Sequence, residues 1–295
     1  MGRLIKLLCL TIVIGSFVAE AKDKVRTIEV QGHRGARAIY PENTLAGFEY
    51  ALGLGVDTLE LDLAVTRGNV LVVSHDPFLN PAICLGPKGK KLDPEKKILI
   101  RQLTFDELQK YDCGTLKHPG FAKQKPVPGQ RIPRLSQVFE MVKNSKLPQA
   151  KSVKFNIETK IVPAYAELTP TPEEFARLVV ELVKSYDLIS RVTIQSFDDR
   201  TLVAAKKLEP KIKTALLIAY NHVDMLVLAK SIGADIISPN HEWILESDVK
   251  TLQRKGIQVI PWTVNEASAW DRLIKMGVDG IITDDPAALL QHLRR

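Results

Sequence analysis

The sequence predicts an α/β fold in which parallel strands close into a barrel. From residue 28 onward, short apolar segments alternate with segments whose apolar residues recur on one helical face. This alternation is typical of a parallel sheet covered by helices. Nine strand candidates occur, two of them adjacent, which fits eight barrel strands and one extra hairpin strand. Because such barrels use about 250 residues as one domain, we expect residues 22–295 to form a single domain.

Each strand candidate is a short, mainly apolar run, and the segments between most of them have the longer period of a helix. The strand candidates lie at 28–33, 58–65, 70–75, 153–159, 192–197, 214–219, 235–240, 258–264 and 279–284. The second and third candidates follow each other closely, without room for a helix. We therefore expect one of them to be the hairpin strand.

The helical segments carry apolar residues at three- and four-residue steps, as a helix with one buried face requires. Examples lie at 43–55, 171–186, 198–208 and 266–277. Helix starts are predicted where a capping side chain precedes acidic residues, at Thr171 and Asn265. Helix ends are predicted at Gly55, Gly233, Gly256 and Gly277.

A doubly wound open sheet is the competing architecture. It would lead us to expect a glycine-rich phosphate loop after an early strand. The GHRG stretch at 32–35 lacks the GxGxxG spacing, and no GxxxxGK[ST] motif occurs in the sequence. The barrel is therefore the favoured fold.

The region 78–134 interrupts the alternation, because it is rich in proline, glycine and lysine and holds only one short helical stretch, at 105–111. We expect an insertion over one end of the barrel, where long functional loops lie; a surface excursion without function is the alternative. Cys84 and Cys113 both fall in this insertion. Either a disulfide in an oxidising compartment or two free thiols would fit the sequence.

The first 21 residues have the layout of a secretory signal peptide. Arg3 and Lys6 precede an apolar run, and a small-x-small pattern ends at Ala21. The run is short for a bilayer span, although a retained N-terminal anchor is the alternative. Cys9 lies inside the run, which argues against a lipid-attachment cysteine. We expect cleavage near Ala21 and a periplasmic or secreted protein without a stable membrane span.

The chain is basic, with a formal net charge of +7. A basic balance favours anionic partners. However, lysine and arginine are spread along the chain, and no basic block with interleaved aromatic residues occurs. We therefore expect no nucleic-acid partner, and the oligomeric state stays open.

Carboxylates on two predicted strands point to a metal site. In TLELDLAV, Glu60 and Asp62 share one face and the leucines share the other, because side chains alternate across a strand. In KFNIETK, Glu158 and Lys160 share a face in the same way. Buried carboxylates need a positive partner, and Ca²⁺ or Mg²⁺ is the natural choice for oxygen ligands. An internal salt-bridge network is the alternative.

Two histidines end predicted strands, and barrels gather functional side chains at the carboxyl ends of their strands. His33 ends the first strand and is followed at once by Arg34, while His75 ends the hairpin region. Imidazole titrates near neutral pH and suits proton transfer. Together with the acids, these histidines predict a catalytic site.

Several motifs in this chain resemble those of the glycerophosphodiester phosphodiesterase family. They are HRGARAIYPENT at 33–44, ELDLAVTRGNVLVVSHDP at 60–77, NIETK at 156–160, IQSF at 194–197, PWTVN at 261–265 and GIITDDP at 280–286. The resemblance covers about residues 28–286, and the insertion is its least diagnostic part. It implies a TIM (β/α)₈ barrel with an inserted subdomain after the second strand region.

The resemblance also implies roles for individual residues, at positions that match the family's motifs. It implies a divalent cation held by Glu60, Asp62 and Glu158, and His33 and His75 as the acid–base pair. Arg34 and Lys160 match phosphate contacts. The implied lining of the pocket is Gln195, Ser196, Phe197 and Trp262.

The implied activity is metal-dependent hydrolysis of glycerophosphodiesters, such as glycerophosphocholine or glycerophosphoethanolamine, to glycerol 3-phosphate and an alcohol. The resemblance does not choose between Ca²⁺ and Mg²⁺. One alternative is a phospholipase of the sphingomyelinase D or lysophospholipase D type, which would need an apolar entrance for acyl chains. Another is a protein that binds phosphodiesters without cleaving them, although no catalytic residue of the motifs is lost.

Overall fold

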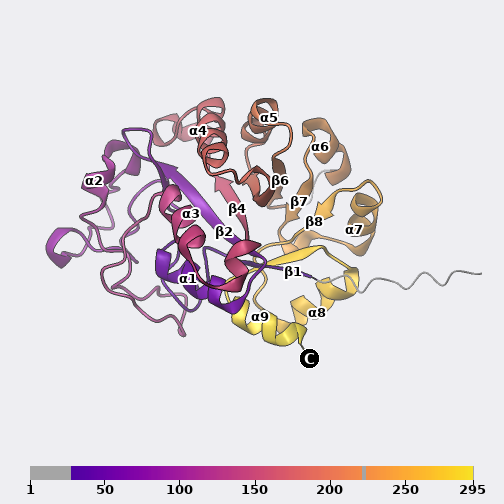
Figure 1. Cartoon of the computed structure of the whole chain (residues 1–295), viewed down its shortest axis with the longest axis horizontal. Helices are drawn as coiled ribbons and strands as arrows, with labels where there is room; N and C mark the ends of the chain where they lie inside the picture. Colours follow the sequence, from indigo (N-terminus) through magenta and orange to yellow (C-terminus); the bar gives the residue numbers. More distant parts are fainter. Residues whose placement is uncertain (1–27, 221–223, 295) are drawn as a thin grey trace, which may run out of the picture.

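The computed structural model describes residues 28–220 and 224–294 (Figure 1). The signal peptide predicted at 1–21 lies outside the described residues. Within the described part, no helix combines the length and the apolar character that crossing a membrane requires.

Eight parallel strands form the barrel, and one antiparallel strand extends its sheet. The strands are β1 (Glu29–Gly32), β2 (Thr58–Val65), β3 (Leu71–Val73), β4 (Lys154–Thr159), β5 (Val192–Ser196), β6 (Lys213–Ile218), β7 (Ile236–Pro239), β8 (Gln258–Val259) and β9 (Gly280–Thr283). The parallel strands neighbour each other in the order β8-β7-β6-β5-β4-β2-β1-β9. The predicted TIM-barrel fold is confirmed.

The barrel closes between β8 and β9 through three backbone hydrogen bonds. They run from Asp279 N to Val259 O at 2.9 Å, from Ile282 N to Pro261 O at 3.0 Å and from Val264 N to Ile282 O at 2.9 Å. The sequence predicts a strand over 258–264, but β8 ends at Val259. Pro261 has no amide hydrogen, which interrupts the ladder there.

The extra strand is β3, as the sequence predicts. It pairs antiparallel with β2, with Val73 opposite Leu63 and Leu71 opposite Val65. This hairpin carries the chain out of the barrel and into the insertion. It also places Ser74 beside β2, where the Ser74 amide donates to Asp62 O at 3.0 Å.

Helices surround the strands, as Figure 1 shows. They are α1 (Leu45–Leu54), α2 (Phe105–Leu108), α3 (Leu135–Asn144), α4 (Pro172–Ser185), α5 (Asp199–Leu208), α6 (Met225–Ile232), α7 (Glu246–Gln253), α8 (Ala267–Met276) and α9 (Pro286–Leu293). Short 3₁₀ turns lie at Pro87–Gly89, Ile100–Gln102, Pro148–Lys151, Pro163–Leu168, Ile189–Arg191 and His241–Trp243.

The predicted helix signals are confirmed except at Gly256 and Asn265. Helix α7 ends at Gln253 with Arg254 as its C-cap, and Gly256 takes the left-handed conformation in the turn that follows. The Thr171 hydroxyl accepts a hydrogen bond from Glu174 N and begins α4, and Gly277 ends α8 in the left-handed conformation. Asn265 does not cap α8, which begins after Glu266 without a side-chain cap. The prediction for Asn265 is wrong because this side chain bonds to Thr283, the last residue of β9, and to Asp284, which follows it.

The side chains of β2 divide as a two-residue period requires. Leu59, Leu61 and Leu63 are buried in the main core, together with phenylalanines of the surrounding helices such as Phe48 and Phe175. Each buried side chain of this size contributes about 1.5–3 kcal/mol of burial free energy. This packing fixes the twist and register of β2, so the opposite face carries Glu60 and Asp62 into the barrel.

The insertion has a small core of its own, and its helix α2 lies to one side of β2 (Figure 1). Its buried residues include Leu79, Ile100 and Leu108, which pack with Val72 of β3. A disulfide links Cys84 to Cys113, which settles the pairing that the sequence left open. The insertion is therefore packed on the barrel and is not a loose surface excursion.

Candidate active site

A cavity of about 260 Å³ lies at the carboxyl ends of the barrel strands. It is lined by His33, Arg34, Arg37, Glu60, His75, Glu158, Lys160, Gln195, Phe197, Leu217, Trp262, Thr263 and Ile282. Most of the residues predicted for the site line this cavity. Asp62 does not line it, because it is fully buried, but its carboxylate lies within 4.8 Å of that of Glu60. Ser196 does not line it, because its hydroxyl is buried and donates to Thr159 O at 2.7 Å.

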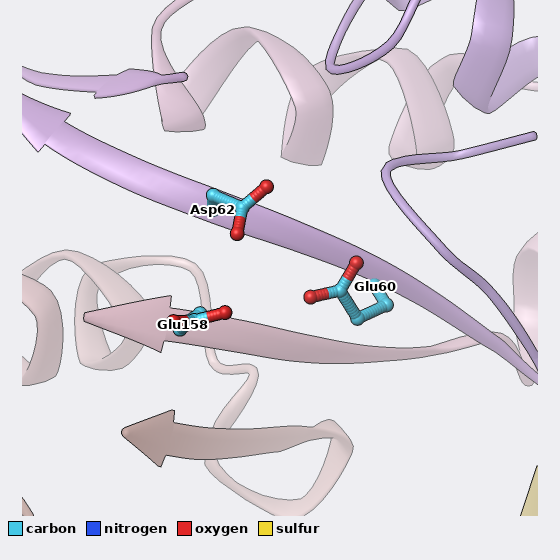
Figure 2. Close-up of side chains that lie close together, drawn as sticks. All are labelled: Glu60, Asp62 and Glu158. Carbon is cyan, nitrogen blue, oxygen red and sulfur yellow. The ribbon is translucent and has the colours of Figure 1, made fainter. Parts of the chain in front are cut away.

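Three carboxyl groups meet inside the barrel (Figure 2). Glu60 and Asp62 extend from β2, and Glu158 extends from the neighbouring strand β4. One oxygen of each lies within 4.8 Å of the others, and all three residues are buried. The pairing of β2 with β4 places Asp62 opposite Glu158. The register of two strands therefore builds the cluster.

The carboxyl groups repel one another, and their pKa values reflect this. Burial and the charges of Asp62 and Glu158 raise the pKa of Glu60 well above its usual range. Burial also raises the pKa of Glu158, and the neighbouring Asp62 adds to this. For Asp62, burial opposes ionisation, but Lys160 and Arg34 outweigh it and hold the pKa well below its usual range. The positive charge of Arg34 does not outweigh burial and the repulsion of the other two acids at Glu60.

These three residues fit a hard divalent cation. Carboxylate oxygens are the ligands that Ca²⁺ and Mg²⁺ prefer. Asp62 Oδ1 is buried and, among the described residues, accepts no hydrogen bond of good geometry, although Lys160 Nζ lies 3.1 Å away. An additional cation would complete the partners of this oxygen. It would also offset the repulsion that raises the pKa of Glu60.

Neutral donors hold the carboxylates in place. Gln195 Nε2 donates to Glu60 Oε1 at 2.7 Å, and the amide of Arg34 donates to Glu60 Oε2 at 2.8 Å. Asn43 Nδ2 donates to Asp62 Oδ2 at 2.9 Å. Such supporting bonds set the direction of a metal ligand. Gln195, predicted to line the pocket, therefore also orients an acid of the cluster.

His33 is backed by a carboxylate that the sequence analysis missed. Its Nδ1 lies 2.5 Å from Asp284 Oδ1, just after β9. Asn265 Nδ2 donates to the other oxygen of Asp284 at 2.8 Å. This contact leaves Nε2 as the atom of His33 that reaches toward Glu60, at 4.0 Å. Burial lowers the pKa of His33, whereas Asp284 acts to raise it.

His75 has a similar support from its own neighbour in sequence. Its Nδ1 lies 2.9 Å from Asp76 Oδ1, and Asn80 Nδ2 donates to Asp76 Oδ2 at 3.0 Å. The His75 side chain is 33% exposed, against 13% for His33. The cavity therefore holds two imidazoles, one buried and one accessible, each paired with a carboxylate.

The two predicted phosphate-binding cations lie against the acids. Arg34 places Nη1 2.8 Å from Glu42 Oε1 and Nε 3.3 Å from Asp62 Oδ2. Lys160 Nζ lies 2.6 Å from Glu158 Oε1. Burial opposes the charge of both cations, but the acids outweigh it and raise the pKa of each. Both stay charged at any physiological pH.

An aromatic wall faces this charged region across the cavity. Phe197 and Trp262 meet edge to face with ring centroids 5.5 Å apart. The indole N–H of Trp262 donates to Ser238 O at 2.8 Å, which fixes the ring. Phe197 is 47% exposed. These side chains can contact the part of a substrate that lies outside the charged centre.

Sequence reasoning missed Asp284, Asp76, Glu42 and Arg37 as members of the site. Asp284 directly follows β9 and Asp76 lies three residues after the end of β3, and this position was the available signal. Glu42 and Arg37 lie in the loop between β1 and α1, where no periodic pattern marks them. Their partners lie in the insertion and after β9, and only the fold brings them together.

Comparison with known proteins shows the same fold and family. A glycerophosphodiester phosphodiesterase from Caldanaerobacter subterraneus is 33% identical over 90% of this chain and 98% of its own length. The crystal structure described as a glycerophosphoryl diester phosphodiesterase from Silicibacter pomeroyi has a TM-score of 0.84, with 28% identity over 91% of this chain and 94% of that chain.

A phosphodiesterase from Oleispira antarctica, solved in complex with the product sn-glycerol-3-phosphate, shares the fold. Its TM-score is 0.73, with 22% identity over 90% of this chain and 97% of that chain. The model of the glycerophosphoryl diester phosphodiesterase family matches residues 33–288. This chain therefore belongs to the glycerophosphoryl diester phosphodiesterase family of enzymes.

Proposed function

We propose that this enzyme hydrolyses water-soluble glycerophosphodiesters, such as glycerophosphocholine and glycerophosphoethanolamine, to glycerol 3-phosphate and an alcohol, and that it needs one divalent cation. The observation that carries the proposal is the cluster of three buried carboxyl groups with oxygens within 4.8 Å of one another. Two carboxylate-backed histidines stand beside this cluster.

Glu60, Asp62 and Glu158 would hold Ca²⁺ or Mg²⁺, which stabilises the negative charge that develops on the phosphoryl oxygens. The bound cation would offset the negative charge of these acids. The ion pairs of Arg34 with Asp62 and of Lys160 with Glu158 would then be weaker. Arg34 and Lys160 then serve as donors to the phosphate. The planar fork of Arg34 suits two phosphoryl oxygens at once.

His33 and His75 divide the two proton transfers of the reaction. The attacking hydroxyl must lose a proton, and the leaving alkoxide must gain one. Asp284 and Asp76 each fix one Nδ1, so each Nε2 is the atom that exchanges protons with substrate. The imidazole that begins neutral acts as base, and the one that begins protonated acts as acid.

The first nucleophile is either the glycerol hydroxyl next to the phosphate or a water molecule. We favour the glycerol hydroxyl. Its attack would expel the alcohol and form a cyclic phosphodiester of glycerol, and a water molecule would then open the ring to give glycerol 3-phosphate. Internal attack would explain selectivity for glycerol with tolerance of many alcohols. A diester of the same alcohol with a glycerol analogue that lacks this hydroxyl tests the idea. Cleavage of this analogue at an undiminished rate would contradict internal attack.

The decisive experiment measures release of glycerol 3-phosphate from glycerophosphocholine by the purified protein, with and without a chelator. We expect release to stop with the chelator and to return with Ca²⁺ or Mg²⁺. Metal analysis of the protein before and after chelation is the control, because a tightly held ion would resist removal. Full activity in protein shown to be metal-free would refute the cation requirement.

A second candidate substrate is a lysophospholipid, and exposed apolar side chains around the barrel mouth favour it. Phe197, Tyr220, Trp243 and Leu245 follow the carboxyl ends of β5, β6 and β7, and each is at least 40% exposed. They offer the apolar entrance that an acyl chain requires. Lysophosphatidylcholine hydrolysed faster than glycerophosphocholine, at equal concentrations below the micelle threshold, would make this candidate the preferred one.

We also propose that the protein is exported and acts in the periplasm or outside the cell. The predicted signal peptide at 1–21 and the Cys84–Cys113 disulfide support this, because disulfides persist in oxidising compartments. N-terminal sequencing of the protein recovered from each cell fraction tests it. A first residue at or near Lys22 in the exported fraction is the expected result.

A further inference from the structure

The insertion makes close contact with the loop that follows β1. Gln124, which is 4% exposed, donates from Nε2 to Arg37 O at 2.7 Å and to Tyr40 O at 3.2 Å. The amide of Lys125 donates to Ile39 O at 2.8 Å. Three hydrogen bonds from one short arm of the insertion thus fix the backbone of residues 37–40.

The same arm also holds the side chain of Arg37. The guanidinium carbon of Arg37 lies 4.8 Å from the centre of the Phe121 ring, and Nη2 lies 3.4 Å from His118 Nε2. Burial and the charge of Arg37 lower the pKa of His118, although Glu42 opposes this. A neutral imidazole beside a guanidinium is a hydrogen-bond acceptor and not a competing cation.

Arg37 differs from the other permanent cations of the cavity in its partners. Arg34 and Lys160 both form ion pairs with Asp62, one of the three clustered carboxylates. Arg37 instead places Nε 3.1 Å from Glu42 Oε2 and 3.9 Å from Asp284 Oδ1, outside that cluster. Its Nε is buried, yet it has no hydrogen bond of good geometry within the described part of the chain.

Arg37 nevertheless lines the cavity that holds both histidines. It stands on the side of β1 and β9, away from the acids on β2 and β4. Among the described residues, its ion pairs are with Glu42 and Asp284 and not with the acids of the cluster. Its side chain is 16% exposed and lines the cavity, so it can meet a substrate group that extends beyond the phosphate.

We propose that Arg37, positioned by His118, Phe121 and Gln124 of the insertion, is a specificity-determining residue that favours diesters whose alcohol carries a carboxylate. This inference rests on the proposed hydrolysis of glycerophosphodiesters. Guanidinium and carboxylate pair through two parallel hydrogen bonds, which a lysine at the same position would not reproduce.

Two substrates isolate the interaction, because glycerophosphoserine and glycerophosphoethanolamine differ only by one carboxylate. We expect Arg37→Gln to lower kcat/KM for glycerophosphoserine by about tenfold or more, the effect of losing a charge-assisted hydrogen bond. For glycerophosphoethanolamine we expect a change of less than about threefold. Turnover of the second substrate by the same preparation also shows that the variant is folded.

Further variants separate the effect of the guanidinium group from the effect of positive charge alone. Lys123→Gln removes a positive charge from an exposed side chain of the same arm, near Asp285 and outside the cavity, so its substrate preference should match that of the wild type. Arg37→Lys keeps the charge without the fork and should recover only part of the preference. His118→Ala should weaken the preference in the same direction, by less than Arg37→Gln.

The outcomes distinguish the two proposals. A wild-type enzyme that cleaves neither diester refutes the proposed function. A wild-type enzyme that cleaves only glycerophosphoethanolamine, or an Arg37→Gln variant that is unchanged, refutes the specificity role alone. Equal loss with both substrates also refutes it, since Arg37 would then act on the phosphate or the fold. If Arg37→Gln does not fold, Arg37→Lys decides by the same ratio.

Discussion

The two sides of the barrel mouth are built differently. Over β1, β2, β4 and β9 lies a polar side, where Glu60, His33 and Asp284 are each held by hydrogen bonds from other strands or loops. Over β5 to β8 lies an aromatic side, where Phe197 and Trp262 make ring contacts and few polar ones. The comparison suggests a division of labour, with chemistry and charged contacts on the fixed polar side and apolar contacts to the substrate on the aromatic side.

The largest effects should come from the histidines of the polar side. Replacing His33 or His75 by alanine should lower kcat by about 10²–10⁴-fold, the usual contribution of general acid–base catalysis. Steady-state kinetics on glycerophosphocholine measure this. A thermal unfolding midpoint close to that of the wild type would separate lost catalysis from lost folding. If either variant kept more than a tenth of the wild-type kcat, that histidine would not be the acid or the base.

A smaller loss is expected from Asp284→Asn. This change keeps the shape of the side chain but removes the charge that fixes Nδ1 of His33. We expect kcat to fall by about 10–100-fold, as for other supporting partners of site residues. KM should change little, because Asp284 does not line the cavity. A loss carried mainly by KM would instead assign Asp284 to substrate binding.

On the aromatic side, Phe197→Ala should act on binding. Loss of one exposed ring contact is worth about 0.5–1.5 kcal/mol, so we expect KM to rise by about two- to tenfold with kcat nearly unchanged. Comparing glycerophosphocholine with lysophosphatidylcholine sharpens the contrast, since an acyl chain would depend more on this wall. If Phe197→Ala lowered kcat as much as we expect for the histidine variants, the distinction between the two sides would be wrong.

The smallest effect concerns the stability of the insertion. Asp112 accepts hydrogen bonds from the amides of Gly114, Thr115 and Gly129, and although burial opposes ionisation, these bonds lower its pKa. Its stabilisation is therefore present above the unfolded-state pKa of about 3.9 and is lost as the pH falls through the lower folded-state value. We expect Asp112→Asn to reduce the unfolding free energy by about 1 kcal/mol at pH 7.

Denaturant unfolding of both proteins at several pH values measures this difference. The two stabilities should begin to converge below about pH 4 and meet below the folded-state pKa of Asp112, because protonated Asp112 resembles asparagine. A difference that stayed constant down to pH 3 would mean that the charge of Asp112 is not its source. Activity at pH 7 should be unaffected, since Asp112 lies outside the cavity.

Local patterns predicted much of this molecule. The two-residue period of β2 was enough to place Glu60 and Asp62 on the inward face, because packing of the leucines leaves no other orientation. The ends of strands located His33 and His75. The end of β8 was less predictable. The apolar residues around Pro261 predict a strand over 258–264, but β8 ends at Val259.

The rest of the site depends on contacts between distant segments. Asp284 reaches His33 only because β9 lies beside β1. Asn265 has the local pattern of a helix cap, but Asp284 offers it a buried partner, and this tertiary contact prevails. The position of Arg37 depends on the insertion, whose proline- and glycine-rich sequence carries no periodic signal. Residues that meet only in the folded chain share no local sequence pattern from which their contact could be predicted.

The contact between His33 and Asp284 joins residues 251 positions apart. Closing so long a loop carries a large entropic cost, and it comes late in folding, after contacts between near neighbours have formed. We therefore expect His33, which follows β1, to reach its final orientation only after β9 has paired with β1. A chain cut before β9 would lack Asp284, the carboxylate that contacts His33, and so would have an incomplete site. Recovery of activity is thus a report on the final step of folding, and during refolding it should lag behind the return of helical structure.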